Sequence, residues 1–319
     1  MTDPLLLIAG PTACGKSGLA MAVAEAFGGV VINADSMQVY RDLRLLTARP
    51  SPADEARVPH ALYGVLDGRE GCSVARWLEL ARTAIAEARA AGRLPILVGG
   101  TGLYLKALTQ GLSPVPDIPP AIRSAARALL AEIGNEAFHV RLGRRDPVMA
   151  SRLSPGNTHR LLRAWEVLEA TGRSLAEWQA LSEWQAHPHS GGCGARALTL
   201  ALLPPREGLR AACDRRFLSM VEAGALAEVA ALAERDLDPS LPVLKALGVP
   251  ELRRHLSGEM SLDAAITLAQ TATRRYAKRQ VTWIRHQLSG AHIVPAQYSE
   301  SLNAEIFPII HRFLLTGIE

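Results

Sequence analysis

The chain has 319 residues, of which 48% are hydrophobic and 21% are charged, as in an ordinary soluble globular protein with one large or two moderate domains. No apolar run approaches the ~18 residues of a membrane span, and the first residues are expected to form a strand rather than a signal peptide, since no basic region with a long apolar segment is present there. Four widely spaced cysteines indicate neither a disulfide framework nor a zinc site. These features favour the cytoplasm, and the net charge of +4 is a weak indication of an anionic partner.

The first informative segment matches the phosphate-loop pattern G-x-x-x-x-G-K-[ST] in full. An apolar run over residues 4–9 predicts a buried strand before it, and an Ala- and Leu-rich stretch over 17–27 predicts a helix after it. Strand, glycine loop and helix together allow backbone N–H groups and a helix N-terminus to surround phosphate oxygens. We expect Lys16 to add a point charge and the Ser17 hydroxyl to reach Mg²⁺. The predicted phosphate-binding residues are Gly10, Pro11, Thr12, Ala13, Cys14, Gly15, Lys16 and Ser17.

The next elements alternate between strand and helix. Residues 30–32 predict a second strand, residues 73–91 a helix, and residues 94–98 a third strand closed by Gly99, Gly100 and Thr101. This alternation is typical of a parallel sheet with helices on both faces. Asp35 directly follows the second strand, so it should face the same crevice as the phosphate loop. It is a candidate general base or metal ligand, although an aspartate there can equally be a turn residue or a helix cap.

The middle of the chain has a different pattern. Residues 113–120 are rich in proline, residues 121–185 are helical in pattern throughout, and residues 187–194 form a second loop before a strand at 197–203. The simplest organisation is an α/β core over 1–113 and 196–319 with a helical insertion over 114–195. Residues 205–287 are mainly helical in pattern, a short strand is expected at 293–294, and a last helix at 299–315.

The third strand lacks a feature that many phosphate-loop enzymes have. ATPases and many kinases carry an aspartate at the end of such a strand to hold Mg²⁺, whereas this strand ends in Val98-Gly-Gly-Thr101. The missing aspartate makes an ATP hydrolase or a motor protein a less favoured prediction. A small-molecule kinase that uses Asp35 remains an alternative.

A basic segment over residues 273–285 contains five Lys or Arg residues and no acid. On a helix Arg275, Lys278 and Arg279 share a face, while Tyr276 and Trp283 can pack inward. Such a run is either a solvated helix face or a contact for an RNA backbone. Arg160 and Arg163 form a second basic pair in the helical insertion.

Taken together, the motifs resemble those of the bacterial tRNA dimethylallyltransferases (tRNA isopentenyltransferases). The resemblance runs over nearly the whole chain, in order and at suitable spacing. It rests on GPTACGKS at 10–17, DSMQVY at 35–40, TARP at 47–50, LVGGTGLYLKAL at 97–108, GLSP at 111–114, RDP at 145–147, HRLLRAWEV at 159–167, RRF at 215–217 and RRYAKRQVTWIR at 274–285.

The resemblance implies a reaction and roles for particular residues. A dimethylallyl group would pass from dimethylallyl diphosphate to N6 of the adenosine immediately 3′ of the anticodon in tRNA. Asp35 would be the general base, while Lys16, Arg216 and Ser17 with Mg²⁺ would stabilise the departing diphosphate, and Thr47 and Thr101 would lie near the reacting centre. The fold implied is a phosphate-loop NTPase-like sheet with an inserted helical domain that clamps the anticodon stem-loop. The enzyme would act as a cytoplasmic monomer without an obligate protein partner.

The resemblance also implies a set of tRNA contacts. They are Asp35, Ser36, Met37, Gln38, Thr101, Arg123, His159, Arg160, Leu161, Leu162, Arg163, Lys245, Lys278, Arg279, Gln280, Trp283 and Arg285. The chain departs from the family pattern at Cys14, where serine is usual, at Leu46, where glycine is usual, and at Val249-Pro-Glu251, which replaces Tyr-Arg-Gln. A position beside Lys16 and backbone N–H groups predicts a favoured thiolate at Cys14, the alternative being a shielded substitute for serine.

Two other functions remain open at this stage. An adenylate isopentenyltransferase, which prenylates free AMP, ADP or ATP, resembles the same core but has less need of an extended RNA contact surface. A phosphate-loop small-molecule kinase is the alternative from another class.

Overall fold

The computed structural model describes residues 4–185 and 196–316, which fall into two compact units. One unit comprises residues 1–109 and 193–319, and the other comprises residues 110–192. The proline-rich stretch predicted a joint after residue 113, whereas the structure divides the chain after residue 109. The joint predicted after residue 195, like the loop predicted over 187–194, lies outside the described residues.

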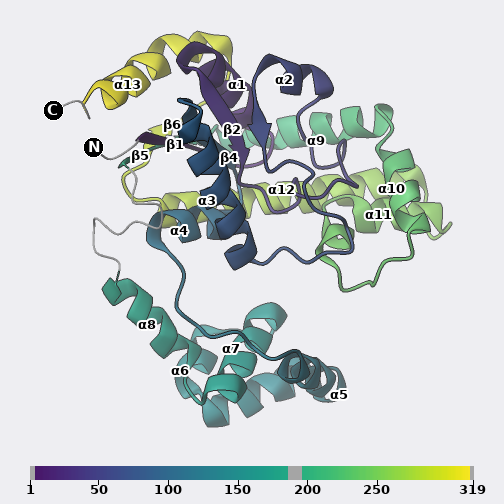
Figure 1. The fold of residues 1–319 in the computed structure, drawn as a ribbon. Helices are drawn as coiled ribbons and strands as arrows, with labels where there is room; N and C mark the ends of the chain where they lie inside the picture. The colour runs from purple at the N-terminus through teal and green to yellow at the C-terminus, as the bar shows by residue number, and fades with distance from the viewer. Residues whose placement is uncertain (1–3, 186–195, 317–319) are drawn as a thin grey trace. The chain divides into compact units, whose positions relative to one another are not determined.

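The larger unit is built on a six-stranded sheet in which every strand pair is parallel. The strands are β1 (Pro4–Ala9), β2 (Gly29–Asn33), β3 (His60–Ala61), β4 (Leu94–Gly99), β5 (Arg196–Leu202) and β6 (His292–Val294), in the order β3-β2-β4-β1-β5-β6 (Figure 1). The chain leaves β1 for β2 on one side and later returns to β5 on the other. The carboxyl end of β1 therefore lies at a topological switch point, where such sheets bind ligands.

Both faces of the sheet are buried, which explains the continuous apolar runs of its strands. Leu5 and Leu7 of β1 face one core with Trp77 of α3 (Val74–Ala90). Leu6 and Ile8 face the other core, which includes residues of α1 (Lys16–Phe27) and α13 (Asn303–Leu315). Helices on both faces confirm the predicted architecture.

The other helices of this unit are α2 (Pro52–Arg57), α4 (Gly102–Gln110), α9 (Arg206–Glu222), α10 (Ala225–Glu234), α11 (Val249–Leu256) and α12 (Leu262–Gln287), with short 3₁₀ turns η1 (Pro242–Lys245) and η2 (Glu300–Leu302). The sequence pattern did not predict α2, β3 or α4. The two-residue strand β3 is specified by pairing with Val31 and Ile32, and no periodic pattern marks it. The predicted last helix is divided between η2 and α13.

The smaller unit is helical in its described residues, with α5 (Pro120–Arg145), α6 (Pro147–Arg152), α7 (Thr158–Thr171) and α8 (Leu175–Gln185). Its core contains Phe138 and Leu142 of α5 and Leu161 and Trp165 of α7. None of the helices in the described parts of either unit is both long and apolar enough to cross a membrane.

Candidate active site at the carboxyl end of β1

The phosphate loop follows β1 directly and ends where α1 begins at Lys16. Gly15 has φ 87°, and a Cβ there would lie 2.7 Å from the Cβ of Tyr298, so both the backbone conformation and the space require glycine. Gly10 is restricted by space alone, since its Cβ would meet the Cys14 Sγ at 2.5 Å. The loop thus has the tight turn and the helix N-terminus expected of a phosphate cradle.

Two cations lie beside this loop. The Lys16 ammonium is 3.5 Å from the Pro11 carbonyl oxygen, and Arg216 of α9 donates a hydrogen bond to the Thr12 hydroxyl. Burial lowers the pKa of Arg216. In the described part of the chain, neither cation forms an ion pair with a carboxylate. A half-buried guanidinium that forms no ion pair is costly, so the arrangement favours an anionic ligand at this loop.

Asp35 lies in a hydrogen-bonded turn at the carboxyl end of β2. The buried Asn33 side chain accepts the Asp35 N–H at 2.8 Å and donates to the carbonyls of Asp35 and Leu62. The Asp35 Oδ1 accepts the Met37 N–H at 2.9 Å. Asp35 therefore does shape a turn, which is one of its two predicted roles. The residue is partly exposed, and within the described residues its second carboxylate oxygen forms no hydrogen bond. Sequence reasoning missed Asn33, although it stands two residues before Asp35.

Several groups lie close enough to Asp35 for its charge to affect their pKa values. Burial and then the Asp35 carboxylate raise the pKa of Tyr276 on α12, and the same two causes raise that of Tyr63. Thr101 lowers the pKa of Tyr276, and its hydroxyl accepts the Ser36 N–H at 3.0 Å. The structure thus brings together Asp35, Thr101 and the Arg216 guanidinium, whose positive charge Asp35 favours.

The segment after β4 allows close approach because it is rich in glycine. A Cβ on Gly99 would meet the Ala34 carbonyl oxygen at 2.1 Å, and one on Gly102 would meet the Trp283 ring at 2.3 Å. These contacts hold the ends of β2 and β4 and the helix α12 against one another. Trp283 is partly buried in this contact, as its predicted inward orientation requires.

A second loop presents Thr47, the position expected near the diphosphate. The Thr47 hydroxyl donates to the Leu43 carbonyl oxygen at 2.6 Å, and the Gln38 side-chain amide donates to the Thr47 carbonyl at 2.8 Å. Glu228 of α10 accepts the backbone N–H groups of residues 44–46. This carboxylate holds the loop in place although the two lie more than 180 residues apart in the sequence. No pattern in the sequence predicted this contact.

The predicted RNA contacts on the larger unit divide into exposed and buried residues. Lys245, Lys278, Arg279 and Arg285 are exposed, whereas Ser36, Met37 and Gln38 are partly buried near Asp35. Gln280 has only 5% of its surface exposed, and both polar atoms of its amide bond to the protein. Gln280 therefore does not form a surface contact for RNA in this structure, and the prediction that it contacts RNA is wrong.

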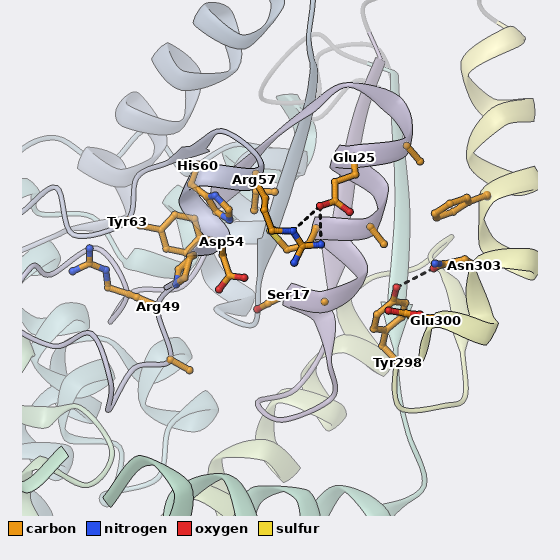
Figure 2. Close-up of a pocket in the computed structure, with 18 residues that line it drawn as sticks. Ser17, Glu25, Arg49, Asp54, Arg57, His60, Tyr63, Tyr298, Glu300 and Asn303 are labelled. Atoms are coloured by element: carbon orange, nitrogen blue, oxygen red, sulfur yellow. Dashed lines mark hydrogen bonds and ion pairs between the residues drawn. The ribbon is translucent and has the colours of Figure 1, made fainter. Parts of the chain in front are cut away.

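The larger unit also contains a cavity of about 660 Å³ along α1, α2 and α13 (Figure 2). Ser17 belongs to its lining, and Arg57, which also lines it, is paired with Glu25 at 2.8 Å. Asp35, Lys16, Thr101 and Arg216 do not line it. The cavity therefore adjoins the phosphate loop at Ser17, while these four residues lie outside its lining.

On the smaller unit, Arg123, His159 and Arg160 are exposed and Arg163 and Leu162 are partly buried. Burial lowers the pKa of Arg163. Leu161 is fully buried in the core of this unit, so the prediction that it contacts RNA is also wrong. Leu161 lies on the inward, apolar face of the amphipathic helix α7, although it follows the basic residue Arg160.

Cys14 differs from its expected state. Its side chain has 0% of its surface exposed and packs in the core beneath α1, and this burial raises the pKa of the thiol above its usual range. Lys16 and the backbone act in the opposite direction but do not outweigh desolvation. The prediction of a favoured thiolate was wrong, because position in the phosphate loop does not by itself expose the side chain.

This burial predicts a resistant thiol. Treatment with iodoacetamide under native conditions should leave Cys14 unmodified, as peptide mass spectrometry would show, while the partly exposed Cys72 is labelled. Cys14→Ser and the parent protein should lose activity at the same rate. Rapid labelling of Cys14, with protection by inorganic diphosphate, would contradict the buried position.

The fold and the site define an α/β protein of the phosphate-loop class, with a carboxylate and two cations at the switch point of its sheet. The chain matches the IPP transferase family over residues 38–287 and the isopentenyl transferase family over residues 4–59, and it belongs to the family of tRNA dimethylallyltransferases.

Relatives of the chain have similar length. The tRNA dimethylallyltransferase of Rhodospirillum rubrum is 57% identical over 318 residues, covering 98% of this chain and 96% of the relative. That of Paramagnetospirillum magneticum is also 57% identical, with 99% and 98% covered.

Solved structures of similar fold support the same family assignment. A tRNA isopentenylpyrophosphate transferase from Bacillus halodurans is 32% identical with a TM-score of 0.71, covering 98% of this chain and 97% of its own. A eukaryotic dimethylallyltransferase acting on tRNA is 26% identical with a TM-score of 0.80, covering 99% and 80%.

Proposed function

We propose that the chain transfers a dimethylallyl group from dimethylallyl diphosphate to N6 of the adenosine immediately 3′ of the anticodon in tRNA, and releases diphosphate. The observation that carries the proposal is the combination of two cations at the phosphate loop, Lys16 and Arg216, with the Asp35 carboxylate near Arg216; within the described residues neither cation forms an ion pair. The relatives' activity supports the same reaction. Bacterial tRNA modification would place the enzyme in the cytoplasm.

The phosphate loop would hold the leaving group. Lys16 and Arg216 would neutralise the negative charge that builds on the bridging oxygen as the C1–O bond of the donor breaks. Such preorganised charge acts most strongly where the site excludes water. The Thr12 hydroxyl, which accepts a hydrogen bond from Arg216, would orient that guanidinium toward the loop.

Asp35 would act on the other substrate. As the adenine N6 forms its bond to C1 of the dimethylallyl group, one N6 proton passes to the Asp35 carboxylate, and the electron pair of the broken C1–O bond leaves with diphosphate. The hydrogen bond from the Met37 N–H fixes one carboxylate oxygen and leaves the other for the proton. An adenine within a stacked anticodon loop must first be extruded to reach this crevice.

Mg²⁺ fits the loop as an ion carried by the diphosphate. Mg²⁺ in phosphate sites takes few protein ligands and keeps phosphate oxygens and waters, and the exposed Ser17 hydroxyl in the first turn of α1 offers one such ligand. No cluster of three His, Cys, Asp or Glu residues that could hold a metal by itself occurs among the described residues. When bound, the ion would neutralise charge on the diphosphate.

RNA would bind along α12. A cavity of about 640 Å³ between α9 and α12 has six basic side chains in its lining and no acidic one, and Lys278 and Arg285 belong to this lining. Its floor includes apolar side chains such as Leu209 and Val281. Concentrated positive charge beside apolar surface favours a nucleic-acid backbone with unstacked bases. The basic helices of the smaller unit would add contacts through Arg123, His159, Arg160 and Arg163.

Replacing Arg279 or Lys278 by alanine should therefore weaken tRNA binding and lower the salt slope of log K by about one unit for each lost phosphate contact. Filter binding over a range of salt concentrations measures the slope. Arg93→Ala is the control, because Arg93 is exposed beyond the opposite end of β4. An unchanged slope in both variants would identify the basic run as a solvated helix face.

The decisive assay uses labelled dimethylallyl diphosphate with unmodified tRNA, AMP or ATP as the acceptor. We expect label in tRNA at the adenosine beside the anticodon and none in the free nucleotides. Efficient labelling of AMP or ATP alone would support an adenylate isopentenyltransferase instead.

A further inference from the structure

Gln280 links three segments that lie far apart in the sequence. Its Oε1 accepts the backbone N–H of Thr12 at 2.8 Å, and its Nε2 donates to the Gly100 carbonyl oxygen at 3.0 Å. Both hydrogen bonds are buried, and they span 268 and 180 residues. One amide thus joins α12 to the phosphate loop and to the end of β4.

The neighbours of Gln280 leave little freedom for this link. A Cβ on Gly100 would lie 2.1 Å from the Gln280 Nε2, so the amide packs flush against the backbone. Thr12 bonds Gln280 through its N–H and Arg216 through its hydroxyl. The position of Gln280 therefore sets the position of Thr12, and through Thr12 it sets that of the Arg216 guanidinium.

The same helix carries the exposed cations proposed to contact RNA. Lys278 and Arg279 immediately precede Gln280, and Trp283 lies one turn further on against Gly102. A shift of α12 by about 1 Å would stretch the 2.8 Å bond beyond hydrogen-bonding distance. A ligand that fixes α12 therefore also fixes the phosphate loop.

We infer that Gln280 is a positioning residue that acts through Thr12 to hold the phosphate loop and Arg216 in the geometry that binds diphosphate. It couples diphosphate affinity to RNA bound on α12. The inference rests on the proposed function for the identity of the two ligands. Coupling of this kind is reciprocal, so tRNA and diphosphate should each tighten the binding of the other by the same factor.

The test compares Gln280→Met, which has similar length but no amide, with the parent protein and with Gln287→Met. Gln287 is exposed near the end of the same helix and serves as the matched control. Binding of inorganic diphosphate is measured by calorimetry with and without unmodified tRNA. Steady-state assays give KM for dimethylallyl diphosphate and kcat.

In Gln280→Met we expect the affinity for diphosphate to fall, and the KM for dimethylallyl diphosphate to rise, by roughly tenfold or more. The reason is that a buried N–H and a buried carbonyl lose their hydrogen-bond partner. We expect tRNA affinity in the absence of diphosphate to change less than about twofold, and the effect of tRNA on diphosphate binding to disappear. Gln287→Met should match the parent in all three measurements.

An unchanged diphosphate affinity and unchanged coupling, with only a lower melting temperature, would make Gln280 a purely structural residue and overturn the inference. If Gln280→Met does not fold, Gln280→Glu decides, since it keeps the acceptor for Thr12 and loses the donor to Gly100. Partial loss of coupling is expected there, and full coupling would overturn the inference. Failure of the parent protein to prenylate tRNA while it binds diphosphate in a Gln280-dependent way would refute the proposed function alone.

Discussion

Asp35→Asn should reduce prenyl transfer to tRNA by about 10²- to 10⁴-fold, the usual cost of losing a positioned general base. Asparagine keeps an oxygen that can accept the Met37 N–H, so the turn after β2 should persist. The amide cannot accept the N6 proton at neutral pH, so the loss should appear in kcat. Single-turnover transfer of labelled dimethylallyl groups, with enzyme and tRNA in excess, isolates this step.

The matched control is Asp236→Asn, an exposed aspartate at φ 46°, where asparagine is also well tolerated. Binding of tRNA by Asp35→Asn should stay within a few-fold of the parent, because the substitution removes one charge from a crevice rich in other contacts. A near-parental single-turnover rate would remove Asp35 from the proton transfer and leave it the role of a turn residue.

Arg216→Ala should lower the rate of transfer by about 10²- to 10³-fold, the range observed when one donor to a developing anion is removed. The structure provides a reason for so large an effect from one half-buried cation. Arg216 is held by the Thr12 hydroxyl and forms no ion pair within the described residues, so its charge is available to the leaving group. Lys16→Ala should act in the same direction.

The neighbouring Arg215 is exposed on α9 and offers a control that differs by one position. Arg215→Ala should retain the parental rate, and Arg216→Lys should recover part of the activity because it restores charge without the planar fork. If Arg215→Ala and Arg216→Ala had equal effects, general surface charge rather than a placed guanidinium would explain the loss.

Local patterns were sufficient to predict the strand, phosphate loop and helix over residues 4–27 and the strands β2, β4 and β5. These elements are specified by apolar runs and by glycine and lysine within a few residues of one another, which act over short distances along the chain. The basic character of α12 and the position of Asp35 after β2 were equally visible. The helices α2 and α4 were not, since neither showed a recognised pattern, and β3 forms only by pairing with β2.

Contacts that span the chain depended on the tertiary structure. Whether Cys14 is a reactive thiolate or a buried thiol was decided by the core that covers it, because desolvation outweighs Lys16. Whether Gln280 faces RNA or the phosphate loop was decided by the packing of α12 against Gly100, and Arg216 meets Thr12 across 204 residues. Sequence by itself determined which chemical groups are present and which local elements carry them. Only the fold decided which groups face one another, because burial and pairing depend on neighbours that the local pattern does not contain.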